Sequence, residues 1–170
     1  MNNKLAAMDI ANYIVWYVNK EKLGAITPLK LQKILYYVST TYLKKTGNLL
    51  FSDNFEKWQY GPVITDVYHN FKVYGINHIA ETAATLEADA SKFLGFKRVD
   101  FDLNKFEDVD MFKTTANKVI STLIKMKAFD LVEMTHEENA WKDFEPMIRA
   151  GKKELKYNLN ELKAAKIICS

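Results

Sequence analysis

The sequence predicts a mainly α-helical fold: a single compact helical domain over residues 1–170 that carries a small two- or three-stranded antiparallel β element. Apolar residues recur at helical spacing in several long segments, glycine and proline separate these segments, and only short stretches show the alternation typical of a strand. A chain of 170 residues with 48% apolar and 26% charged residues has the composition of a globular domain, and it can bury enough surface to fold without disulfides.

The N-terminal half is predicted to contain three helices, at residues 5–21, 28–46 and 62–74. The middle helix has the clearest signals, because Thr27 suits an N-cap, proline is favoured at the first helical position and Gly47 suits a C-terminal stop. Its apolar residues form one stripe at helical spacing, which we expect to face the core: Leu31, Ile34, Leu35, Val38 and Tyr42.

Residues 51–60 form an aromatic connector between the second and third helices. Trp58 and Tyr60 alternate with polar residues in it, which indicates a short strand, and residues 99–103 alternate in the same way. We expect these two segments to pair. Residues 77–95 show little pattern and are expected to hold a turn and a partial, alanine-rich helix.

The C-terminal half returns to the helical period. Residues 108–127 are predicted to form a long core helix, and Asp130 can cap a shorter helix at residues 131–138. Pro146 breaks the chain after it. The tail at residues 158–168 again has apolar residues at helical spacing, so we expect it to dock on the other helices.

Features of secreted and membrane proteins are missing from the sequence. The longest uninterrupted apolar run is residues 13–18, which is far shorter than the roughly 20 residues of a membrane helix. The N-terminus lacks the apolar region of a signal peptide, and the single cysteine, Cys169, agrees with a reducing compartment. We therefore expect a soluble, cytoplasmic protein with no membrane partner.

The side chains that enzymes use for chemistry form no known pattern here. His136 and Glu137 resemble the start of a zinc-protease motif, but Ala140 stands where its second histidine would be. There is no glycine-rich phosphate loop and no thiol placed as a nucleophile. We therefore expect no enzyme activity and no catalytic, cofactor-binding or metal site.

The formal net charge of +3 is too small to require a polyanionic partner, but its distribution is uneven. Lysines concentrate between residues 20 and 45, and basic residues concentrate again between residues 149 and 166. Such surfaces either face an acidic partner or are the solvated faces of amphipathic helices, with lysine stems covering the rim of the core.

Three segments carry a resemblance to a known family: ITPLKLQKILYY at residues 26–37, FEKWQYGPVITDVY at residues 55–68 and LVEMTHEENAW at residues 131–141. In order and spacing they resemble the Panacea domain family of SocA-like antitoxins and phage-associated GepA-like proteins. The resemblance implies a mainly helical, non-enzymatic domain that neutralises a toxin protein by binding it directly. The toxin is usually encoded by the adjacent gene.

Two other functions remain open at this point. One branch of the family acts as an adaptor that presents a toxin to a bacterial ATP-dependent protease, and this would require a second surface for a protease or chaperone, for which the stretch around Lys152, Lys153 and Lys156 is a candidate. A small hydrolase or a nucleic-acid binder is less expected. A hydrolase would need His136 or Glu137 to converge with another group such as Asp66.

The expected partner-binding residues are Gln32, Lys33 and Tyr36, which lie beside the core stripe and are expected to point to its rim, together with Tyr60 and Tyr68. The two tyrosines come near that rim if the helices on either side of the connector pack as an antiparallel pair. Alternatively, the tyrosine rings lie in the core and only their hydroxyls reach water. The other motif residues are expected to hold the fold: Trp58, Gly61, Pro62, Val63, His136, Glu137 and Trp141.

Overall fold

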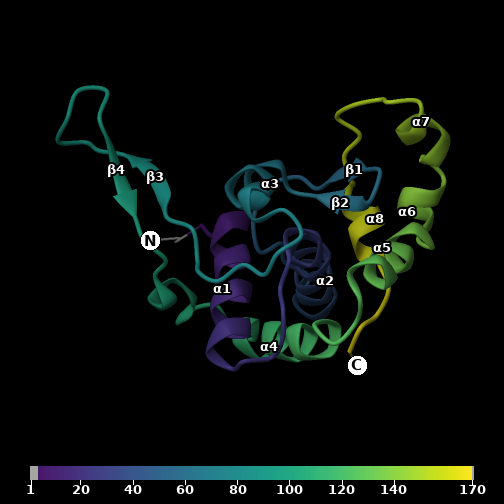
Figure 1. The fold of residues 1–170 in the computed structure, drawn as a ribbon, viewed down its shortest axis with the longest axis horizontal. Helices are drawn as coiled ribbons and strands as arrows, with labels where there is room; N and C mark the ends of the chain where they lie inside the picture. Colours follow the sequence, from purple (N-terminus) through teal and green to yellow (C-terminus); the bar gives the residue numbers. More distant parts are fainter. Residues whose placement is uncertain (1–3, 170) are drawn as a thin grey trace.

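The computed structural model describes residues 4–169, which are arranged around helix α2 (Pro28–Thr46) at the centre of Figure 1. The side chain of Thr27 accepts a hydrogen bond from the Lys30 amide and caps the helix, and Gly47 ends it in the left-handed conformation with φ of 76°. Twelve of its nineteen residues are buried, so the helix is enclosed on most of its circumference and not along one stripe alone.

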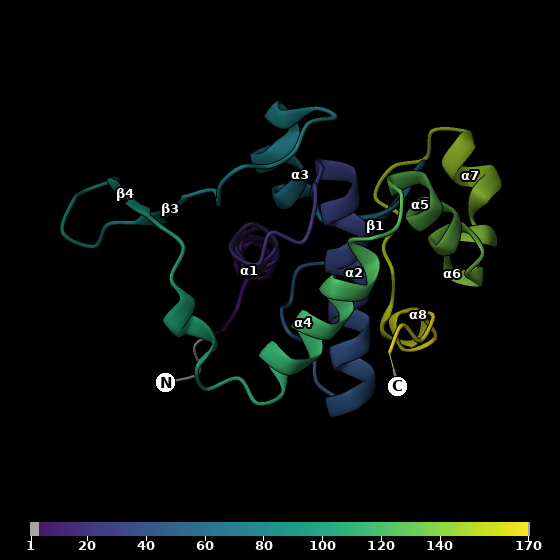
Figure 2. The ribbon, with the colours of Figure 1, turned by 60° about the horizontal axis from the view of Figure 1, so that its bottom comes forward.

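Other helices enclose α2. Figure 2 shows α4 packed along α2, with α1 seen nearly end-on beside them, and α5 and α8 contact α2 from other directions. The predicted mainly α-helical fold is confirmed. Within residues 4–169 the other α-helices are α1 (Ala7–Lys20), α3 (Thr65–Phe71), α4 (Phe112–Leu123), α5 (Ala128–His136), α6 (Asn139–Lys142), α7 (Glu145–Arg149) and α8 (Leu159–Lys163), with short 3-10 turns at Lys72–Tyr74 and Leu103–Phe106.

The predicted β element is present as two separate antiparallel hairpins. Strands β1 (Glu56–Trp58) and β2 (Gly61–Val63) pair with Trp58 opposite Gly61, and β3 (Thr85–Ala88) pairs with β4 (Phe96–Val99). The expected pairing of the connector with residues 99–103 is therefore wrong. A turn of only two residues joins β1 to β2, so the nearest partner of the connector is the segment that follows it.

Local contacts explain the other differences from the expected elements. Pro62 lies in β2, so α3 begins only at Thr65. The segment before β3 is extended, because the Asn12 side chain pairs with both backbone groups of Ala83. Helix α4 begins at Phe112, since Met111 takes a left-handed conformation, and α5 begins at Ala128, so that Asp130 lies inside its first turn. The C-terminal helix is shorter than expected and covers only Leu159–Lys163.

The β3–β4 hairpin forms an arm that projects away from the helices (Figure 1). Leu86 and Phe96 lie on one face of it, and both are exposed. Phe93, near the tip, is 97% exposed. Within residues 4–169 no helix combines the length and the apolar character that crossing a membrane requires.

Candidate protein-binding site

Side chains of the first motif (residues 26–37) form hydrogen bonds with the backbone of the second motif (residues 55–68). The Gln32 amide pairs with both backbone groups of Ile64: its Nε2 donates to the carbonyl at 3.1 Å, and its Oε1 accepts from the amide at 2.9 Å. Lys33 Nζ donates to the Pro62 carbonyl at 2.8 Å. Helix α2 therefore holds the β1–β2 hairpin and the residue after it in a fixed position.

The first and third motifs meet at the buried carboxylate of Glu138. The hydroxyls of Tyr36 and Tyr37 donate to its two oxygens at 2.7 and 2.8 Å, and the backbone amide of Lys166 donates to the second oxygen at 3.0 Å. Burial, followed by the nearby carboxylate, raises the pKa of both tyrosines well above the ordinary value. Both hydroxyls therefore remain protonated and act as donors.

The second motif (residues 55–68) and the third (residues 131–141) also contact each other directly. Trp141 Nε1 donates to the Trp58 carbonyl at 2.8 Å, and the ring of His136 stacks on that of Trp141 with centroids 3.5 Å apart. Burial lowers the pKa of His136, so the imidazole is neutral near pH 7. Glu137 is exposed and forms an ion pair with Lys166.

Three of the expected partner-binding residues do not reach the surface. Gln32 is 4% exposed, and Lys33 and Tyr36 are fully buried, so the expectation that they point to the rim is wrong. The β1–β2 hairpin and α5 cover this side of α2, and the polar ends of the three side chains bond to groups inside the fold. Tyr60 and Tyr68, in contrast, are 48% and 39% exposed, so these two rings lie at the surface and not in the core.

The exposed aromatic residues belong to a groove of about 820 Å³ next to the hairpin. The rings of Trp58 and Tyr68 meet edge to face with centroids 5.1 Å apart, and Tyr60 meets Phe129 in the same way at 5.8 Å. We call this site the hairpin groove. Its lining comes from the start of α2, from the hairpin, from α3 with the turn after it, and from residues 148–154, and its apolar part includes Leu29, Val63, Val67, Phe71 and Ile148.

The hairpin groove has a basic rim. Its exposed basic residues are Lys72, Arg149, Lys152 and Lys153, and its acidic ones are Glu56 and Glu154. Arg149 is paired with Glu145 at 2.8 Å, and Glu56 accepts a hydrogen bond from Trp58 Nε1 at 3.2 Å. The buried Lys57 is paired with Glu161 at 2.6 Å. The positive charge that remains comes mainly from Lys72, Lys152 and Lys153.

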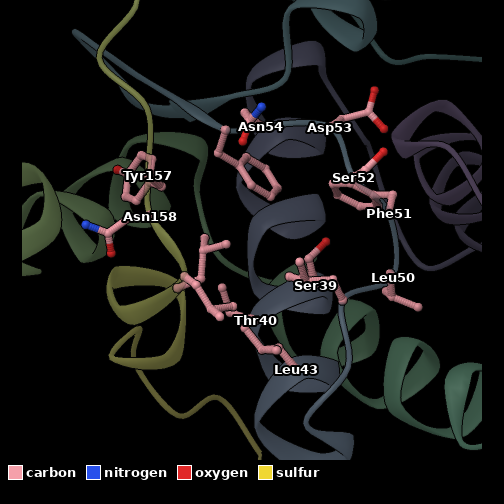
Figure 3. Close-up of a pocket in the computed structure, with 14 residues that line it drawn as sticks. Ser39, Thr40, Leu43, Leu50, Phe51, Ser52, Asp53, Asn54, Tyr157 and Asn158 are labelled. Atoms are coloured by element: carbon pink, nitrogen blue, oxygen red, sulfur yellow. The ribbon is translucent and has the colours of Figure 1, made fainter.

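A second, smaller cavity of about 210 Å³ lies between α2, the loop after it and the segment that leads into α8 (Figure 3). Its polar groups serve the fold: Ser39 Oγ donates to the Leu35 carbonyl, and the Asp53 carboxylate accepts from the Ala7 amide at the start of α1. We therefore assign this cavity no chemistry and take the hairpin groove as the candidate site.

The buried titratable side chains of Lys33, Tyr36, Tyr37 and Glu138 form hydrogen bonds that hold the motifs together. Within residues 4–169 no three His, Cys, Asp or Glu side chains cluster as metal ligands. The exposed rings beside the groove are tyrosine and tryptophan, which are enriched among the residues that dominate protein-binding surfaces.

Comparison with known proteins agrees with the three motifs. Residues 31–142 match the family described as "Antitoxin SocA-like, Panacea domain", and since this match covers more than half of the chain, the chain belongs to that family. The "Antitoxin SocA" of Caulobacter vibrioides (strain NA1000 / CB15N) is 28% identical over 111 residues, which are 65% of this chain and 55% of that relative. The match thus spans about half of the relative's length. No solved structure matches the chain.

Sequence reasoning missed two parts of this arrangement. Glu138 stands in the polar run THEEN at residues 135–139, and only the packing of α5 against α2 shows that it faces the core. Residues 148–154, which form one wall of the hairpin groove, are recognisable in the sequence only as part of a basic stretch. Nothing in the local sequence indicates that they lie beside a hairpin ninety residues earlier in the chain.

The buried lysine predicts a pH dependence of stability. Burial lowers the pKa of Lys33 to about 7 in the folded protein, whereas an unfolded lysine has a pKa of about 10.4. Between about pH 7 and pH 10 the unfolded chain binds more protons at this residue, so the free energy of unfolding should rise with pH by at most about 1.4 kcal/mol per unit. Above about pH 10 the raised pKa of the buried tyrosines acts in the opposite direction.

Urea unfolding at several pH values between about 7 and 9.5 would test this expectation. Lys33→Met, which keeps the length of the side chain, should flatten the rise. Lys45→Met at the exposed end of the same helix should leave it unchanged. A slope that Lys33→Met retains would contradict the assignment to Lys33.

Proposed function

We propose that this protein is an antitoxin that neutralises a cognate toxin, encoded by the adjacent gene, through direct binding in the hairpin groove. Membership of the antitoxin family supports the general role, and it favours a binding function without catalysis. The single structural observation that carries the location is the exposure of two tyrosines beside Trp58: Tyr60, in the turn of the hairpin that the family motifs hold in place, and Tyr68, on α3, whose ring meets that of Trp58.

Tyrosine and tryptophan are enriched among the residues that dominate binding energy, because they bring large contact area with little loss of side-chain entropy. The hairpin is fixed before any partner arrives, since Gln32, Lys33 and Trp141 bind its backbone and the residue after it. A partner therefore meets a pre-organised surface and loses less free energy in ordering it.

The test is co-expression with the product of the neighbouring gene in cells that this product arrests. The wild-type chain should restore growth and bind the product in a pull-down. The double variant Tyr60→Ala, Tyr68→Ala should bind at least about tenfold more weakly and should restore growth poorly. Phe93→Ala, which removes a more exposed aromatic ring from the distant arm, is the control and should behave as wild type.

Failure of the wild-type chain to bind the product or to restore growth would refute the antitoxin role. Wild-type behaviour of the tyrosine double variant would leave that role intact and place the binding surface elsewhere.

A proteolytic adaptor is the second candidate, because the structure offers a second surface. The β3–β4 arm projects on the side of the molecule away from β1, β2 and α7 (Figure 1). Its exposed apolar side chains include Leu86, Phe93 and Phe96. An adaptor would shorten the lifetime of the toxin in cells, whereas an inhibitor would leave it unchanged or lengthen it. A pulse-chase measurement of the toxin with and without this chain separates the two functions.

A further inference from the structure

We infer that the hairpin groove takes an acidic segment of the partner protein, one that places a large apolar side chain against Trp58 and Tyr68 and its carboxylates against the basic rim. This inference rests on the proposed function for the existence of a protein partner, and it adds the chemistry by which that partner is recognised. It also assigns a role to the basic stretch at residues 149–153 that the family motifs do not cover.

The apolar lining of the groove indicates that the partner inserts a large apolar side chain there. Trp58 and Tyr68 stand edge to face at 5.1 Å, with Leu29 and Val67 also in the lining. A volume of about 820 Å³ is far more than one side chain fills, and it lies within the range of pockets that bury ligands of several residues' size. A tryptophan, phenylalanine or leucine of the partner, with its neighbours, would cover this surface.

The basic rim indicates that the bound segment of the partner is negatively charged. Lys72 follows α3 and the pair Lys152, Lys153 follows α7, and these elements lie on two sides of the hairpin in Figure 1. Arg149 and Lys57 already have carboxylate partners within the protein, whereas the three lysines have no carboxylate of this chain within salt-bridge distance among residues 4–169. A basic rim favours an acidic partner, both in the rate of encounter and in the choice among partners.

The hairpin itself limits how the segment can bind. The outer edge of β1 is occupied, because the Lys57 amide donates to the Leu155 carbonyl at 2.6 Å and the Tyr157 amide donates to the Phe55 carbonyl at 2.9 Å. The outer edge of β2 is occupied as well, because the Pro62 carbonyl accepts from Lys33 Nζ and both backbone groups of Ile64 pair with the Gln32 side chain. Since neither edge of the hairpin is free, a partner cannot bind by adding a strand. Recognition must therefore depend on side chains, which are the apolar anchor and the carboxylates.

Selection from a random peptide library tests the inference without the toxin. Peptides of about twelve residues, displayed on phage, are selected on the immobilised full chain and then measured in solution by fluorescence anisotropy. We expect selected peptides to be rich in Asp and Glu and to share one aromatic residue or leucine. Their affinity should fall as salt increases.

Variants locate the site. The charge reversal Lys152→Glu, Lys153→Glu and the truncation Tyr68→Ala should each weaken binding of the selected peptides by about tenfold or more. The reversal Lys113→Glu, Lys125→Glu on exposed positions of α4 and the loop after it makes the same change in net charge away from the groove, and it should leave the affinity unchanged. Circular dichroism shows that each variant is folded.

Three outcomes would overturn the inference: a library that yields no binder, selected peptides that are neutral or basic, and equal loss of affinity in the α4 control. None of them bears on the antitoxin role, which the growth assay tests separately. Selection of acidic, aromatic peptides that bind the groove, combined with a failed growth assay, would support this inference and refute the toxin as the partner.

Discussion

Replacing Gly61 with alanine is expected to lower the free energy of unfolding by about 3 kcal/mol or more, because two costs add. Gly61 has a φ of 96°, a conformation that residues with a Cβ rarely adopt. A Cβ there would also lie 2.4 Å from Thr135 Oγ1 and 3.2 Å from Lys33 Cε, both of them buried. The hairpin would have to move away from α5 and α2, and chemical denaturation would measure the loss.

Gly47→Ala is the matched control for the backbone part of this effect. Gly47 has a φ of 76°, but nothing lies within 4 Å of the position that its Cβ would take. Its replacement should cost only about 1 kcal/mol. The double variant Gly61→Ala, Thr135→Ala removes the hydroxyl that the new Cβ would meet. It should therefore recover part of the stability that Gly61→Ala loses beyond Gly47→Ala. Equal effects at the two glycines would show that the close approach at Gly61 has no energetic importance.

Truncation of Glu138 to alanine is expected to cost about 3 to 5 kcal/mol. The change removes the acceptor of two tyrosine hydroxyls and of the Lys166 amide, and all three donors would be left without their carboxylate partner in or near the core. It also loosens the segment after α8, which loses the hydrogen bond of the Lys166 amide and keeps that of the Ala165 carbonyl with Lys44 of α2. Thermal and urea unfolding would measure the stability, and hydrogen exchange at residues 157–166 would report the release.

Glu137→Ala makes the same chemical change one residue earlier and serves as the control. The Glu137 side chain is 64% exposed and pairs with a lysine that is itself partly exposed, so its removal should leave the free energy of unfolding nearly unchanged. Tyr36→Phe and Tyr37→Phe should each lose less than Glu138→Ala, since each removes one donor and leaves the carboxylate its other partners. A loss at Glu137 as large as that at Glu138 would contradict the network.

The sequence predicted the helices well where a cap, a stripe and a stop coincide. Helix α2 begins after Thr27 and ends at Gly47 as expected, because those signals depend on local backbone geometry. The hairpin β1–β2 was only half predicted, since Gly61-Pro62 reads equally well as a break before a helix and as the second strand of a hairpin.

The candidate site was predicted in part for a similar reason. The position of Gln32 and Lys33 between apolar stripe residues normally means exposure, but here other elements cover that face and supply backbone partners for both side chains. Helical periodicity describes one element at a time. It cannot show that a hairpin from later in the chain covers the polar side of α2, and therefore it cannot distinguish a buried, bonded lysine from a solvated one.

The walls of the hairpin groove are synthesised at different times, because they come from distant parts of the chain. Its first wall is translated with residues 28–32 and its last with residues 148–154, and the edge of β1 is closed only by the segment that ends at Tyr157. At the usual bacterial pace of 5–20 residues per second, roughly 8 to 30 seconds separate initiation from the synthesis of that segment. A nascent chain that already contains all three family motifs therefore lacks a complete groove. Removal of the segment after α7 from a finished molecule would return it to the same incomplete state.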